Sequence, residues 1–88
     1  MALGWKVYII ETQSGKLYTG ITKDIYRRFA EHKSKKAGAK YFNMSPPKEV
    51  IFLESFSSRS EATKREIVIK KMSRQQKLGL IDSFNHKL

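Results

Sequence analysis

Two short runs of β-branched and aromatic residues, joined by a turn signal, constrain the fold of this chain more than any other feature. Residues 5–11 are WKVYIIE and residues 16–21 are KLYTGI, and both compositions are typical of β-strands. Between them stand Gln13, Ser14 and Gly15, residue types that favour a tight turn. The chain is therefore predicted to begin with a β-hairpin.

A helix and an irregular segment are predicted to follow the hairpin. Asp24 can cap a helix that extends to about residue 36, with Ile25 and Phe29 one turn apart on its buried side. Residues 37–48 contain glycine, asparagine and a proline pair, which interrupt regular structure. We expect this segment to be irregular and to expose its lysine and tyrosine side chains.

The second half of the chain is predicted to hold one more strand and two helices. Residues 49–56, EVIFLESF, are apolar enough to form a strand that is mostly buried and either central in its sheet or covered. Capping boxes begin at residues 58 and 73, and they open a helix over roughly 59–72 and a last helix after it. The order strand, strand, helix, strand, helix, helix predicts an α+β fold, in which a small, mostly antiparallel three-stranded sheet is flanked by helices.

Length and composition narrow the class of protein. With 88 residues, the chain is predicted to form a single domain over residues 1–88. It contains no cysteine, which excludes disulfides, thiolate zinc sites and a cysteine nucleophile and makes a reducing compartment the default. No apolar run approaches the roughly 18 residues that span a bilayer, and the N-terminal run is too short for a signal peptide. We therefore expect a soluble, cytoplasmic protein.

The charge balance indicates an anionic partner. Eighteen Lys and Arg residues against eight Asp and Glu residues leave a formal net charge of +10. Such a field attracts polyanions, so nucleic acid is the first partner to expect, with an affinity that falls as salt rises. Nucleases, repressors, ribosomal proteins and membrane-surface proteins all share this charge, so particular side chains must decide between them.

Tyr8 and Tyr18 are the first pair of side chains that a functional site could use. From composition alone, the simpler explanation is that both tyrosines pack in the core of the hairpin and have no catalytic role. Both phenols point from one face only if paired residue numbers sum to an even value, with Tyr8 opposite Gly20. That register requires a three-residue loop with Gly15 left-handed, because a two-residue loop gives an odd sum. A shared role for the two tyrosines therefore predicts the loop type.

Three polar side chains on the predicted helices each have two explanations. Arg28 and His32 lie one turn apart on the first helix, either as a solvated flank or as phosphate-binding and proton-carrying groups. Glu66 falls at the edge of the buried stripe of the next helix, where it can pair with Lys70 or hold a hard divalent ion. Spacing alone does not choose between these explanations.

Taken together, these residues resemble the GIY-YIG nuclease family. The two motif strands are matched by VYI at 7–9 and YTG at 18–20, followed by Arg28, His32 and, on a later helix, Glu66. The resemblance covers nearly the whole chain and looks most like the small, stand-alone bacterial members related to the N-terminal nuclease domain of the excision-repair endonuclease. It implies a divalent-metal-dependent DNA endonuclease, such as a structure-specific DNA repair nuclease.

The resemblance also implies roles for individual residues. The catalytic set would be Tyr8, Tyr18, Arg28, His32 and Glu66, with Gly20 as the motif glycine. One Mg²⁺ or Mn²⁺ ion on Glu66 would steady the leaving group, and Arg28 would bind the phosphate. Tyr8 or Tyr18 would be the general base, with its phenol pKa lowered by the cation and by Arg28, and His32 would either relay the proton or donate to the phosphate.

Basic and aromatic side chains are candidates for DNA binding outside that set. Trp5, Tyr26 and Tyr41 can stack on unpaired bases, although packing explains each of them more simply. The side chains predicted to track the phosphate backbone are Lys33, Lys35, Lys36, Lys40, Lys64, Arg65, Lys70 and Lys71. With so few elements that could recognise bases, we expect recognition of flapped, branched or single-stranded regions of DNA.

Two other functions stay open. Several family nucleases carry an asparagine about a dozen residues after the metal glutamate, whereas this chain has QQKL at 75–78, and Asn85 lies too far along to replace it. The alternative is therefore a nucleic-acid-binding module that keeps the nuclease fold with little or no turnover. A basic ribosome-associated or structural protein is a third class, and it would prefer RNA to DNA.

Overall fold

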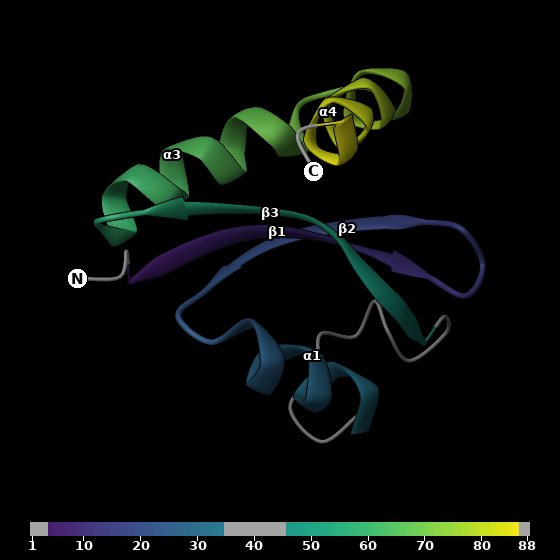
Figure 1. Ribbon diagram of the computed structural model, residues 1–88, viewed down its shortest axis with the longest axis horizontal. Helices are drawn as coiled ribbons and strands as arrows, with labels where there is room; N and C mark the ends of the chain where they lie inside the picture. Colours follow the sequence, from purple (N-terminus) through teal and green to yellow (C-terminus); the bar gives the residue numbers. More distant parts are fainter. Residues whose placement is uncertain (1–3, 35–45, 87–88) are drawn as a thin grey trace.

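The computed structural model describes residues 4–34 and 46–86, and it has the predicted α+β architecture (Figure 1). The elements in chain order are β1 (Trp5–Thr12), β2 (Leu17–Thr22), α1 (Ile25–Ser34), β3 (Pro47–Phe56), α3 (Arg59–Lys70) and α4 (Arg74–His86). The predicted element order and the antiparallel pairing of the three strands are confirmed. Most of the segment expected to be irregular, 37–48, lies outside the described residues, while Pro47 and Lys48 begin β3.

Strand β1 is the centre of the sheet, with β2 on one side and β3 on the other. Its four consecutive residues 7–10 are all buried, as expected for a strand that is covered on both faces and paired at both edges. Residues 49–56 were expected to form a strand that is mostly buried and either central or covered. The covered alternative holds, whereas the expected burial is wrong, since Phe52 is the one buried residue among them. Strand β3 pairs with β1 alone among the described strands. Its first residue, Pro47, lacks an N–H and suits the start of an edge strand. Apolar composition alone does not distinguish an edge strand covered by helices from a central one.

Helices cover both faces of the sheet (Figure 1): α1 lies on one face, and α3 and α4 lie on the other. Because side chains alternate along β1, Val7 and Ile9 join the core on the side of α3 and α4, whereas Tyr8 and Ile10 join the core on the side of α1. The larger core, which contains Val7 and Ile9, lies under α3 and α4, and the smaller core, which contains Tyr8 and Ile10, lies under α1. Within the described residues, the helices are too short or too polar to span a lipid bilayer.

Helix α1 begins at the predicted cap. The Asp24 carboxylate accepts a hydrogen bond from the backbone N–H of Arg27 at 3.1 Å, which satisfies one of the free donors of the first turn. Ile25 and Phe29 pack against the core that contains Tyr8, as their spacing predicted. This packing places the next helical turn, which carries the candidate site residues, over the same face of the sheet.

Both predicted capping boxes are present in the C-terminal helices. The hydroxyl of Ser58 accepts from the backbone N–H of Glu61 at 3.2 Å at the start of α3. The hydroxyl of Ser73 accepts from the backbone N–H of Gln76 at 3.1 Å, and the Gln76 side chain accepts from the Ser73 N–H at 2.9 Å. These local signals set where α3 and α4 begin, although α3 ends at Lys70 rather than near residue 72.

The hairpin has the loop type that a shared role of the tyrosines required. Residues 13–15 form a three-residue loop, and Gly15 has a φ of 88°, in the left-handed region. The register places Tyr8 opposite Gly20 and leaves Tyr8 and Tyr18 on the same face. The predicted even-sum register is therefore confirmed.

Candidate active site

The two tyrosines lie side by side on the α1 face of the sheet. Their ring centroids are 6.4 Å apart, with Tyr18 on β2 and Tyr8 on β1. Tyr8 is buried, with 1% of its surface exposed, whereas Tyr18 is half-buried. The neighbouring strands therefore bring two phenols to one place, which composition alone did not establish.

Gly20 allows the Tyr8 ring to lie where it does. A β-carbon added to Gly20 would sit 2.7 Å from the Tyr8 Cζ and would overlap the phenol oxygen. The sequence predicted a close approach of backbone or ligand at this glycine, and the group that makes it is the phenol of Tyr8. The absence of a side chain at Gly20, in the second motif, therefore makes room for the ring of Tyr8, in the first motif.

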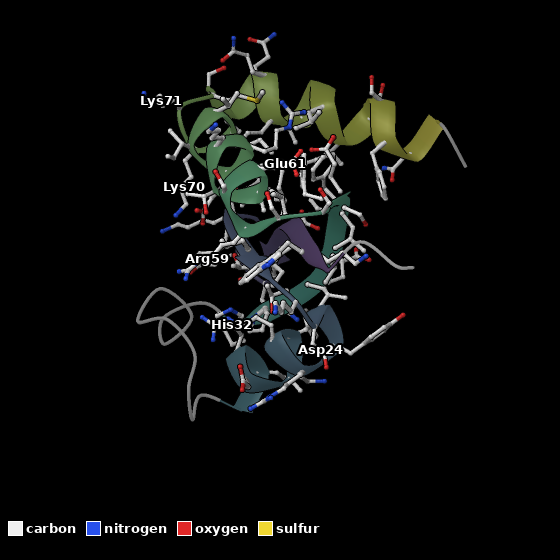
Figure 2. All side chains as sticks on the ribbon, turned by 90° about the vertical axis from the view of Figure 1, so that its left-hand side faces the viewer. Asp24, His32, Arg59, Glu61, Lys70 and Lys71 are labelled. Atoms are coloured by element: carbon white, nitrogen blue, oxygen red, sulfur yellow. The ribbon has the colours of Figure 1, made fainter. Side chains whose placement is uncertain are left out.

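His32, which Figure 2 labels, lies on helix α1 and packs against both tyrosine rings. Its side chain is fully buried, its Nε2 lies 3.4 Å from the Tyr8 hydroxyl, and its ring meets the Tyr18 ring edge-on at 5.6 Å. Either atom of the Tyr8 and His32 pair can donate, depending on the tautomer of the imidazole. The explanation of His32 as a solvated helix flank is therefore wrong.

Arg28 lies one turn before His32 and is half-buried. Its guanidinium forms a hydrogen bond with the Tyr8 phenol and an ion pair with Glu31, at 3.3 Å between Nη1 and Oε1. Glu31 also pairs with Arg27 at 3.3 Å. The sequence analysis did not select Glu31 as a functional residue, although its spacing of three and four residues from the two arginines is the pattern that brings opposite charges together on a helix.

Burial dominates the proton affinities of this cluster. It raises the pKa of Tyr8 above its ordinary value of 10.0, and the hydrogen bond from Arg28 opposes this effect without overcoming it. Burial also lowers the pKa of His32 below 6.5, and the positive charge of Arg28 lowers it further. Arg28 therefore lowers the pKa of the Tyr8 phenol as expected, but burial outweighs it, and the net pKa in the protein without a bound cation is raised. The reason is that removing a phenolate from water costs more than one neighbouring cation returns.

Glu66 lies on helix α3, which covers the face of the sheet opposite to α1. Its side chain is 17% exposed, and its Oε2 lies 3.2 Å from Nζ of Lys70, one turn later. Its negative charge also contributes to the raised pKa of Tyr8. The ion pair with Lys70 that the sequence allowed is present. The negative charge of Glu66 also acts on the Tyr8 phenol and favours its protonated form.

The donor set at Glu66 suits a hard divalent cation that keeps most of its own ligands. Among the described residues, no three His, Asp or Glu side chains gather closely enough to enclose a metal ion. Mg²⁺ commonly binds through one or two carboxylates and fills its remaining positions with water and phosphate oxygens. A single, partly accessible carboxylate therefore fits such an ion, whereas it would not fit a fully enclosed metal site.

The predicted backbone-binding residues fall into three groups. The side chains of Lys33, Lys64, Lys70 and Lys71 are exposed. Arg65 instead pairs with Glu54 on β3 at 2.8 Å, so its charge is partly used within the fold. Lys35, Lys36 and Lys40 lie outside the described residues, as does Tyr41.

Several further residues bear on the predictions made from the sequence. Tyr26 is 87% exposed, whereas Trp5 packs against the larger core. Asn85 is exposed near the end of α4, and Gln76, in the segment where the family asparagine is expected, uses its side chain to cap α4. The neighbouring amide, Gln75, is exposed.

Comparison with known proteins agrees with this arrangement. The family model described as the GIY-YIG catalytic domain matches residues 4–79. UPF0213 protein Reut_B5558 of Cupriavidus pinatubonensis is 46% identical over 75 residues, covering 85% of this chain and 82% of that protein. UPF0213 protein DP2720 of Desulfotalea psychrophila is 44% identical over 77 residues, covering 88% of this chain and 70% of that protein.

Two solved structures are similar as well. The solution NMR structure of protein EF2693 from E. faecalis has a TM-score of 0.62 and 37% identity, over 91% of this chain and 84% of that one. The solution NMR structure of UPF0213 protein BH0048 from Bacillus halodurans has a TM-score of 0.57 and 33% identity, over 89% of this chain and 82% of that one. With the tyrosine pair, the arginine helix and the glutamate helix in the family order, this chain belongs to the GIY-YIG nuclease family.

Proposed function

We propose that this protein is an endonuclease that hydrolyses phosphodiester bonds of DNA with the help of a divalent cation. The observation that carries the proposal is the meeting of Tyr8, Tyr18, Arg28 and His32 in one cluster, within the electrostatic reach of Glu66. These side chains come from four separate elements. Packing alone would not require an arginine and a carboxylate beside two phenols and an imidazole.

Arg28 has the chemistry to hold the phosphate. Its guanidinium carries five N–H donors in a plane that can meet two phosphate oxygens at once, and it contacts Tyr8 and Glu31. Because these contacts also fix its orientation, the cation is positioned before DNA binds. It would then stabilise the additional negative charge that develops on the phosphate in the transition state.

Tyr8 and His32 form a pair that can accept a proton. Tyr8 is a poor base by itself at neutral pH because its pKa is raised. His32 is neutral there because its pKa is lowered, and its Nε2 is 3.4 Å from the phenol oxygen. We infer that Tyr8 takes a proton from the attacking water as it passes its own proton to His32. Tyr18, which is less buried, is the second candidate base.

Glu66 is the residue that would hold the metal, as Mg²⁺ or Mn²⁺. A bound ion supplies positive charge to the phosphate oxygens and to the leaving oxygen. Lys70 neighbours the carboxylate, and its ammonium must move aside for an ion to bind at Oε2.

The proposal is tested by incubating the protein with nicked, flapped and branched DNA, with and without Mg²⁺ or Mn²⁺. We expect cation-dependent cleavage by the wild type and its loss in Glu66→Gln, whereas the exposed β3 variant Glu49→Gln serves as the matched carboxylate control. Tyr8→Phe and Tyr18→Phe separate the two candidate bases, since removal of a general base typically costs about 10²–10⁴-fold in rate. If wild type and Glu66→Gln leave every substrate equally intact, the nuclease proposal fails.

One observation favours a second function, a DNA-binding module with little turnover. Gln76, in the segment where several family nucleases carry an asparagine, caps α4 instead. This function predicts metal-independent binding with a steep salt dependence that Glu66→Gln does not change. A competition between matched DNA and RNA duplexes tests the third class, since a ribosome-associated protein would select RNA.

A further inference from the structure

The indole ring of Trp5 brings together two cations from distant parts of the chain. Nζ of Lys23 lies 5.3 Å from a ring centroid, and the guanidinium carbon of Arg59 lies 5.7 Å from it. Lys23 directly follows β2, and Arg59 is the first residue of α3. Because Trp5 lies opposite Phe56 at the start of β1 and packs against the larger core, its ring has a fixed position.

The two cations keep their hydrogen-bonding capacity. Both side chains are exposed, and within the described part of the chain neither forms an ion pair with a carboxylate. A cation over an aromatic ring is attracted by the negative charge of the ring face. This contact restrains the side chain without occupying its N–H groups as a carboxylate would, so those donors can meet an anion.

The position of Arg59 is unfavourable for helix stability alone. The first turn of a helix favours negative charge because the helix dipole is positive there. Arg59 nevertheless occupies the first position of α3, and the Trp5 ring partly offsets this cost. The contact with the Trp5 ring therefore orients the Arg59 guanidinium, whereas the helix dipole does not stabilise it.

A shallow hollow connects Trp5 and Lys23 with the candidate active site, while Arg59 lies on the Trp5 ring outside its lining. It has a volume of about 420 Å³, and its lining includes Trp5, Lys23, Arg27, Arg28 and Glu31. Trp5 and Lys23 therefore border the same space as Arg28. Figure 2 shows Arg59 on the same side of the molecule as His32, with Lys70 and Lys71 beyond it.

We propose that Trp5, Lys23 and Arg59 form a phosphate clamp that binds the DNA backbone next to the phosphate held by Arg28. Lys23 and Arg59 donate hydrogen bonds to phosphate oxygens, and Trp5 positions both cations. The clamp rests on the proposed function for the choice of DNA as its ligand. It adds to the sequence-based set of phosphate contacts, which included neither Lys23 nor Arg59.

The test is the affinity for end-labelled flapped DNA without divalent metal, measured over a series of salt concentrations. Lys23→Gln and Arg59→Gln should each weaken binding and reduce the salt slope by about one unit, because each removes a neutralised phosphate. The matched controls are Lys48→Gln on β3 and Arg74→Gln on α4, which remove the same charges away from the Trp5 ring. If the clamp variants bind no more weakly than these controls, the clamp is wrong.

Trp5 provides a test that does not change the net charge. Trp5→Leu should weaken binding severalfold, whereas Trp5→Phe should retain most of the affinity because phenylalanine also offers an aromatic face to a cation. Thermal unfolding of both variants shows whether each is folded at the assay temperature. Equal loss of affinity in the two folded variants would overturn the positioning role of the ring.

The clamp and the nuclease proposal fail separately. Glu66-dependent cleavage together with clamp variants that bind like their controls would leave the nuclease proposal intact and remove the clamp. Selective loss of binding in Lys23→Gln and Arg59→Gln, without cleavage of any substrate by the wild type, would keep the clamp and remove the nuclease activity.

Discussion

The phenol of Tyr8 lies against the backbone of Gly20, the residue directly opposite it on the neighbouring strand. A β-carbon at Gly20 would overlap the Tyr8 hydroxyl and come within 2.7 Å of its Cζ. The ring therefore passes across β2 at a position without a side chain, and its hydroxyl reaches His32. The geometry of the candidate site depends on this one missing methyl group.

Gly20→Ala should lower both stability and cleavage. The added methyl group cannot be accommodated unless the Tyr8 ring or the strand moves, and overpacking of this kind typically costs about 1–3 kcal/mol in the free energy of unfolding. Chemical denaturation measures the stability, and the cleavage assay measures the displacement of Tyr8.

Gly79→Ala is the matched control for that substitution. Gly79 lies within α4, and an added β-carbon there meets nothing within 4 Å. Alanine should therefore stabilise the helix by about 0.5–1 kcal/mol, because glycine loses more backbone entropy on folding. Equal stability of the Gly20→Ala and Gly79→Ala variants would contradict the close packing of Tyr8 on Gly20.

Gly15→Ala should destabilise the hairpin. Gly15 has a φ of 88°, and a left-handed conformation costs an ordinary L-residue roughly 1–2 kcal/mol. Gly15→Asn should cost less, since asparagine tolerates this region better than alanine does. Urea unfolding of the two variants checks the order, and a Gly15→Ala variant as stable as wild type would rule out the three-residue loop.

Folding stability should fall as the pH drops below 6.5. Burial makes the pKa of His32 lower in the folded protein than its ordinary value of 6.5. The unfolded chain therefore binds more protons than the folded protein between the folded pKa and 6.5, and stability decreases across that interval. Urea midpoints measured from about pH 8 down to about pH 5 report this loss. His32→Gln should lack this decrease, whereas His86→Gln should retain it.

The same titration should appear in catalysis. Protonated His32 cannot accept a proton from Tyr8, so kcat should decline on the acid side, below the ordinary histidine range. A rate that stays constant through this range in a protein that is still folded would remove His32 from the proposed proton transfer.

Arg28→Lys should reduce cleavage by about a hundredfold. Lysine keeps the charge but lacks the planar pair of donors, and loss of such a contact to the transition state typically costs about 3 kcal/mol. Arg28→Met should also raise the pKa of Tyr8 further, because the hydrogen bond and the charge that lower it are both removed. The ultraviolet absorbance of the phenolate, compared with that of Tyr8→Phe, measures this shift.

Lys70→Gln should tighten the binding of Mn²⁺ at Glu66. The ammonium of Lys70 is 3.2 Å from the carboxylate and competes with a metal ion for the same oxygen. An ion pair near the surface with one exposed partner is worth about 1 kcal/mol, so the change in affinity should be about fivefold. Paramagnetic Mn²⁺ titration detects it in the absence of DNA, and Lys64→Gln serves as the control for a general change in charge.

Local features of the sequence predicted a large part of this fold. The two capping boxes and the Asp24 cap identified where the helices begin, because a cap depends on residues within one turn of each other. The hairpin register followed from requiring both tyrosines on one face. The family pattern then selected five side chains, of which Tyr8, Tyr18, Arg28 and His32 lie in mutual contact or close to it.

Other features depend on contacts between distant segments. An apolar run does not reveal whether a strand pairs on one side or both, so the sequence left β3 as either central or covered, and the structure gives the central place to β1. The clamp joins Trp5, Lys23 and Arg59, which no spacing rule connects. The pKa of Tyr8 rises rather than falls because burial, which the sequence does not specify at that position, outweighs Arg28. The sequence by itself determined which chemical groups are present and where each helix begins. Tertiary packing decided which groups contact one another and how deeply each is buried. Burial and neighbouring charges together set the charge state of each titratable group.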